Sequence, residues 1–135
     1  IVLAFLMPIV ASMGGNAGMQ TLAVTVRTLA TNDLTKNNFS KNIFKEFNIG
    51  ILNGVIFATI SAFIVQIWFQ DTKLSIIISI SMILTMIVAG LFGILVPITL
   101  KNINIDPAIA SSVFVTTITD VIGFVSFLGV SAYFL

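Results

Sequence analysis

The chain has 135 residues, of which 58% are hydrophobic and only 8% are charged, and its formal net charge is +1. Ordinary soluble domains carry about 25% charged residues, so this composition and the mean hydropathy of +1.15 indicate an integral membrane protein. The small net charge argues against nucleic-acid binding. The absence of cysteine and histidine excludes disulfides, thiolate nucleophiles and the commonest zinc ligands and general bases.

Four apolar segments are long enough to cross a bilayer, for which about 20 residues are needed. We therefore expect an all-α fold, a bundle of transmembrane helices that forms one domain over residues 1–135. The expected spans are residues 1–30, 48–69, 74–100 and 107–135. The chain starts at Ile1 with no basic residues before the apolar run, so we expect it to be a piece of a longer protein without a signal peptide.

The first segment combines an apolar start with a polar stripe. Five residues at helical spacing share one face: Ser12, Asn16, Gln20, Ala23 and Arg27. Gly14 and Gly18 form a GxxxG pattern, which lets another helix backbone approach closely. Two interpretations stay open, a seam of packed helices with bonded amides and a water-filled cavity that satisfies those amides.

The middle of the chain is less informative about chemistry. Residues 31–47 are polar with recurring aromatics, and they predict either a short amphipathic helix at the membrane interface or a solvated loop. The link at residues 70–73 is so short that the second and third spans must be antiparallel neighbours. The third span carries no recognisable chemistry, and we expect a lipid-facing scaffold. Asp106 followed by Pro107 is typical of a helix N-cap with proline at the first helical position.

The basic residues indicate the orientation. Because the spans alternate in direction, the polar segments 31–47 and 101–106 lie on one side. That side also carries nearly all of the cationic residues: Arg27, Lys36, Lys41, Lys45 and Lys101. The other side has only Lys73. The positive-inside rule then makes both segments cytoplasmic and places Ile1 and Leu135 outside, in a multi-pass protein of the cell (inner) membrane.

The fourth span contains a single charged residue, Asp120. A carboxylate at the centre of a membrane helix costs about 2.5–3.5 kcal/mol, so it needs a polar environment. Thr116, Thr117 and Gly123 share its helical face, and we expect glycine to leave open space beside the carboxylate. The face predicts a pore for a hydrated cation. The remaining alternative is a protonated carboxyl hydrogen-bonded inside the bundle, because Arg27 lies at the wrong depth to pair with Asp120.

The side chains also limit the kind of ion and the kind of protein. Without a nucleophile–base pair we expect no enzyme. Oxygen ligands favour hard cations, whereas methionines at these spacings are more often core residues. Mg²⁺ keeps its waters and takes one or two carboxylates, which a two-fold axis would supply from two copies of Asp120. We therefore rank Mg²⁺ above Ca²⁺, and either above Na⁺ or H⁺, with Mn²⁺ as another occupant.

Three stretches resemble the MgtE family of magnesium channels and transporters. They are PIVASMGGNAGMQT at 8–21, KEFNIGILNG at 45–54 and DPAIASSVFVTTITDVIGF at 106–124. The resemblance covers the whole chain and implies the second to fifth of five helices in each subunit of a homodimer. It also implies that the first helix and the cytoplasmic Mg²⁺-sensing domains of many members lie outside this sequence.

The same resemblance implies roles for individual residues. The pore would follow the dimer axis, with hydrated Mg²⁺ held by Asp120 and the carbonyl of Thr116. Gly15, Asn16, Gln20 and Gly123 match pore-facing positions of the family. The sequence departs from the family pattern at Ser112 and Val113, where Gly-Pro is expected, and this puts the local bend of the helix in doubt.

Two other functions remain open at this point. A cation exchanger or symporter would use Asp120 to bind Na⁺ or to carry a proton, and its flux would depend on those gradients. A membrane assembly module would use the polar seam merely to pack helices, and it would show no flux.

Overall fold

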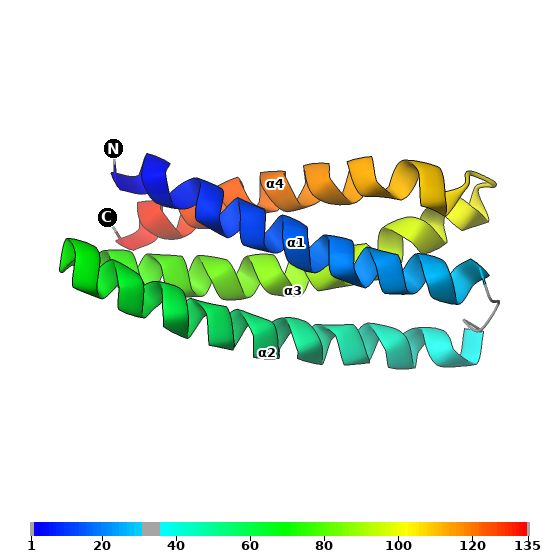
Figure 1. The fold of residues 1–135 in the computed structure, drawn as a ribbon, viewed down its shortest axis with the longest axis horizontal. Coiled ribbons are helices and arrows are strands. Elements are labelled where there is room, and N and C mark those ends of the chain that lie inside the picture. Colours follow the sequence, from blue (N-terminus) through cyan, green and yellow to red (C-terminus); the bar gives the residue numbers. More distant parts are fainter. Residues whose placement is uncertain (1, 31–35, 135) are drawn as a thin grey trace.

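The computed structural model describes residues 2–30 and 36–134, and these residues form four α-helices. They are α1 (Val2–Ala30), α2 (Lys36–Phe69), α3 (Thr72–Asn102) and α4 (Pro107–Phe134). The chain runs up and down through the bundle, so both of its ends lie at the same end of the molecule (Figure 1). The all-α fold expected from the sequence is confirmed.

Helix α3 is the centre of the bundle. It packs against each of the other three helices and lies between α2 and the pair formed by α1 and α4 (Figure 1). Its residues Ile77, Ile78 and Met82, in the N-terminal part of the helix, are completely buried. The expectation that this span is a lipid-facing scaffold is therefore wrong. A helix that is apolar on all sides is typical of a buried helix as well as of a lipid-exposed one, and here the former applies.

Glycines bring the helix backbones into contact. A Cβ added at Gly54 would lie 2.9 Å from the Cα of Ile83, and one added at Gly50 would lie 3.0 Å from the Cα of Ile87. A Cβ added at Gly93 of α3 would lie 2.9 Å from the backbone carbonyl oxygen of Gly18 of α1. The close approach predicted from the GxxxG pattern of α1 thus occurs in α1 and also in α2.

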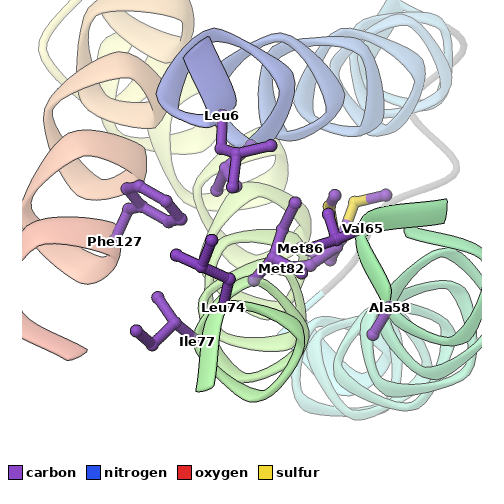
Figure 2. Packing of buried hydrophobic residues seen from close by; sticks show 10 residues of the cluster. Leu6, Ala58, Val65, Leu74, Ile77, Met82, Met86 and Phe127 are labelled. Carbon is purple, nitrogen blue, oxygen red and sulfur yellow. The ribbon is translucent and has the colours of Figure 1, made fainter. Parts of the chain in front are cut away.

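The apolar part of the core lies in the half of the bundle near the chain ends. Figure 2 shows Leu6 of α1 and Phe127 of α4 beside the α3 residues Leu74 and Met82, with Val65 of α2 on the other side. The other half contains the glycine contacts described above, together with the buried apolar residues Leu22, Ile94 and Val115. Because lipid tails are as apolar as these side chains, the contacts stabilise the bundle through van der Waals packing.

Two short connections define the ends of α3. Asp71 caps its N-terminus, since the Oδ1 atom accepts a hydrogen bond of 2.9 Å from the amide of Lys73. At the other end Asn104 has φ 63°, and the amide of Ile105 donates to the carbonyl of Leu100 at 2.9 Å. This is the Schellman arrangement, in which a left-handed residue ends a helix. Helix α4 then begins at Pro107, the first helical position predicted from the sequence.

The structure refines the extent of the predicted spans. Within the described residues, three helical stretches are long and apolar enough to cross a membrane: Phe47–Phe69, Thr72–Asn102 and Ser112–Phe134. Helix α1 is not among them, because amides and an arginine lower the mean hydropathy of its described part. Its crossing of the membrane stays a prediction. Helix α2 begins at Lys36, not at 48, so residues 36–47 are its first turns, and 31–35 lie outside the described residues.

Candidate cation site

The polar stripe of α1 points away from the bundle. Each of its members is exposed at the surface of the subunit: Ser12, Asn16, Gln20, Ala23 and Arg27. The opposite side of α1 is buried, with Val10 and Gly14 against the rest of the bundle. One helix therefore presents apolar and small residues to its own subunit and polar residues outward. The amides of Asn16 and Gln20 make no hydrogen bond to any other residue that the structure describes.

Helix α4 presents Asp120, Thr116 and Thr117 at the same surface of the subunit, and all three side chains are exposed. The contact between Thr116 and Met19 of α1 joins the two polar faces, with Thr116 Oγ1 3.9 Å from Met19 Sδ. Within residues 2–30 and 36–134, no ion pair or hydrogen bond of the Asp120 carboxylate is found. The carboxylate is thus directed away from the bundle.

The antiparallel register of α1 and α4 sets the depth of these groups. A Cβ added at Gly15 would lie 3.8 Å from Thr119 Oγ1, and one added at Gly123 would lie 3.0 Å from the Cα of Ala11. Asp120 therefore lies at the level of Gly15, within one helical turn of Asn16 along the bundle. Arg27 is twelve residues further along α1, or about 18 Å at 1.5 Å per residue, which agrees with the prediction that it cannot neutralise Asp120.

Gly123 requires a correction. It is buried, and the α1 backbone at Ala11 occupies the space beside it. The open patch that we expected next to the carboxylate is therefore filled within the subunit. The structure accounts for this glycine by the close packing of α1 on α4, and its role in a pore stays a prediction.

Sequence reasoning missed two residues beside the site. Thr119 is fully buried, and its Oγ1 donates a hydrogen bond of 2.9 Å to the carbonyl of Thr116, the carbonyl that the resemblance places at the ion. Met19 is 40% exposed next to Thr116, although methionines were expected in the core, as Met82 and Met86 indeed are. The exposure of Met19 could have been predicted from its position in the sequence, because it lies within one helical turn of the polar stripe.

The donor set within one subunit is small and consists of oxygen atoms. Among the described residues no group of three or more acidic or histidine side chains could hold a metal ion. One exposed carboxylate, hydroxyls and amides suit a hard cation that keeps its water shell. The bundle and this site together define a helical membrane protein with an exposed polar face on α1 and α4.

Comparison with known proteins gives the family. A model of the MgtE family, described as divalent cation transporters, matches residues 7–130 of this chain. The chain belongs to this family, which is one of transporters and not of enzymes. It is 34% identical over 135 residues to the magnesium transporter MgtE of Bacillus subtilis. The aligned region covers 100% of this chain and 30% of that protein.

Two further relatives show the same pattern. The magnesium transporter MgtE of Enterococcus faecalis is 31% identical over 134 residues, which are 99% of this chain and 30% of the relative. That of Thermus thermophilus is 33% identical over 131 residues, 96% of this chain and 28% of the relative. The chain thus spans less than a third of the length of these relatives, whose other parts lie outside it.

Proposed function

We propose that this chain is the membrane part of a magnesium-transporting protein, in which hydrated Mg²⁺ is held by Asp120 from each of two subunits. The observation that supports this most strongly is the exposed Asp120 carboxylate, which makes no bond within the described residues of its own subunit. The three relatives are magnesium transporters by name. Mn²⁺ and Ca²⁺ are further occupants that the same oxygen atoms would accept.

A second copy of the chain resolves the energetic problem of this surface. Exposed to lipid, Asp120 would cost about 2.5–3.5 kcal/mol, and the amides of Asn16 and Gln20 would add to that cost. Facing the same surface of a second subunit, these groups line a path that water can fill. Two carboxylates then meet around one hydrated ion, which fits Mg²⁺ because this ion retains most of its waters.

The residues of the path would act in different ways. Asp120 supplies the negative charge, and the Thr116 carbonyl adds a dipole that the Thr119 hydroxyl holds in place. The hydroxyl of Thr117 and the amides of Asn16 and Gln20 would bond the waters of the ion, as would the Gly15 backbone. Outer-sphere contacts of this kind hold a hydrated ion weakly enough to release it.

The test is Mg²⁺ flux into liposomes that contain the purified protein, with Asp120→Asn beside the wild type. Loss of the charge should reduce flux at least tenfold, while expression and thermal stability stay near wild type. Asp71→Asn is the matched control, because asparagine also caps a helix and Asp71 lies at the end of the bundle. Normal flux in Asp120→Asn would show that Asp120 does not hold the ion.

The same assay separates the alternatives. A coupled exchanger that cycles a proton or Na⁺ on Asp120 would show flux that follows an imposed pH or Na⁺ gradient. A channel for hydrated Mg²⁺ would respond to the Mg²⁺ gradient and the membrane potential alone. An assembly module would show no Mg²⁺ flux in the wild type at all.

A further inference from the structure

A pocket lies between α1, α2 and α3, away from the contact of α1 with α4. Its volume is about 170 Å³. The residues that line it come from all three helices: Ala17, Gln20, Thr21, Val24, Ile49, Gly50, Asn53, Met86 and Gly90. Beside the pocket, Gly50 lets α2 pack closely on the α3 backbone at Ile87.

The pocket is polar at one place. The amides of Gln20 and Asn53 line it from α1 and α2, and the third polar side chain, Thr21, donates its hydroxyl proton to the carbonyl of Ala17 at 3.2 Å. Neither amide forms a hydrogen bond with another residue in the part of the chain that the structure describes. Asn53 is half-buried and Gln20 is exposed, so both amides can bond a molecule in the pocket.

The occupant of the pocket follows from the needs of these amides. An acyl chain would leave their donors and acceptors without partners, which is unfavourable in an apolar environment. Water satisfies them, and a pocket of this volume has room for several water molecules beside the two amides. Gln20 also belongs to the exposed stripe of α1, so the pocket and the proposed cation path share a side chain.

We propose that this pocket is a water-filled side chamber of the cation path, in which Gln20 and Asn53 bind the water shell of a hydrated divalent cation. Among the described residues that line the chamber there is no carboxylate, so these amides contact the waters and not the metal ion. That the cation reaches the chamber rests on the proposed function, whereas the presence of water there does not. Asn53 thereby becomes a residue of the path on a helix that the sequence analysis did not assign to it.

The absence of cysteine from the chain allows a direct test. Asn53→Cys is introduced into the 135-residue chain, which is reconstituted in liposomes and exposed to a cationic, membrane-impermeant methanethiosulfonate. We expect labelling within about tenfold of the rate for Gln20→Cys. Leu52→Cys is the matched control, because this neighbour is 60% exposed but does not line the pocket, and we expect it to react at least a hundredfold more slowly.

Added Mg²⁺ tests the second part of the proposal. Compared with Na⁺ at equal ionic strength, millimolar Mg²⁺ should slow the labelling of Asn53→Cys several-fold. If Asn53→Cys is labelled but Mg²⁺ does not slow the reaction, the chamber contains water, and the proposal that the cation binds there is wrong. If Asn53→Cys reacts as slowly as Leu52→Cys, the chamber is not filled with water and the whole inference is wrong.

Two further variants keep the result interpretable. Ile49→Cys probes the same pocket one turn away on α2, so a folding defect of Asn53→Cys does not end the test. Asp120 does not line the pocket, so labelling of Asn53→Cys should persist when Asp120→Asn is added. A normal flux in Asp120→Asn would overturn the proposed Asp120 site, whereas slow labelling of Asn53→Cys would overturn the chamber.

Discussion

Three hydroxyl groups are fully buried near the middle of this bundle. Ser81 and Thr85 of α3 and Thr119 of α4 are all fully buried. Only Thr119 donates a hydrogen bond, to the carbonyl of Thr116, whereas the oxygens of Ser81 and Thr85 have no partner among the described residues. An unpaired buried hydroxyl is unfavourable by about 1–3 kcal/mol, so the two threonines should respond differently to the same substitution.

We expect Thr85→Val to unfold at the same temperature as the wild type or at a higher one. Valine has the shape of threonine and removes a hydroxyl that has no partner. Thr119→Val is the matched comparison, and loss of its 2.9 Å hydrogen bond should destabilise the protein by about 0.5–1.5 kcal/mol. Thermal unfolding of the purified protein in detergent measures both. A clear loss of stability in Thr85→Val would show that its hydroxyl is hydrogen-bonded in the folded protein.

At the scale of the helices, glycine decides where backbones meet. Gly50 and Gly54 are one turn apart on α2, and both face the α3 backbone at Ile87 and Ile83. Gly129 of α4 differs, because a Cβ added there would meet nothing within 4 Å. Alanine favours a helix over glycine by about 1 kcal/mol, so the effect of Gly→Ala depends on whether space is available.

Gly54→Ala should therefore lower the stability of the bundle by about 1–3 kcal/mol, because the added methyl group forces α2 away from α3. Gly129→Ala should leave the stability unchanged or raise it. Size-exclusion chromatography after heating compares the two variants in the same detergent. Equal unfolding temperatures would mean that α2 can shift on α3 without loss of packing.

The positions of the helices in the chain could be predicted from the sequence better than the packing of one helix on another. Hydropathy and the Asp-Pro pair placed the beginning of α4 at Pro107, and the spacing of Asn16 and Gln20 placed them on one face. The central position of α3 could not be predicted, since an apolar helix fits lipid and protein equally well. Gly123 packs against Ala11 of α1. This contact joins residues far apart in the sequence, so the residues around Gly123 could not predict it.

The two ends of the whole molecule differ in charge and packing. The end with the chain termini contains the apolar core around Phe127 and carries Lys73, whereas Arg27 and Lys101 lie at the other end. Helix α2 has 34 residues, about 51 Å at 1.5 Å per residue, and is longer than the roughly 30 Å hydrocarbon core. Its polar first turns then extend past the membrane at the end that carries most of the basic residues.

This asymmetry predicts the orientation of the protein in the cell. Because basic residues are retained in the cytoplasm, Lys73→Cys should react with a membrane-impermeant maleimide added to intact cells. Lys101→Cys should react only after the membrane is permeabilised. Both lysines are exposed at helix ends and the chain has no other cysteine, so the two variants differ mainly in sidedness. If only Lys101→Cys is labelled in intact cells, the chain termini lie in the cytoplasm and the predicted orientation is wrong. Lys73 would then be the one lysine of this pair on the cytoplasmic side.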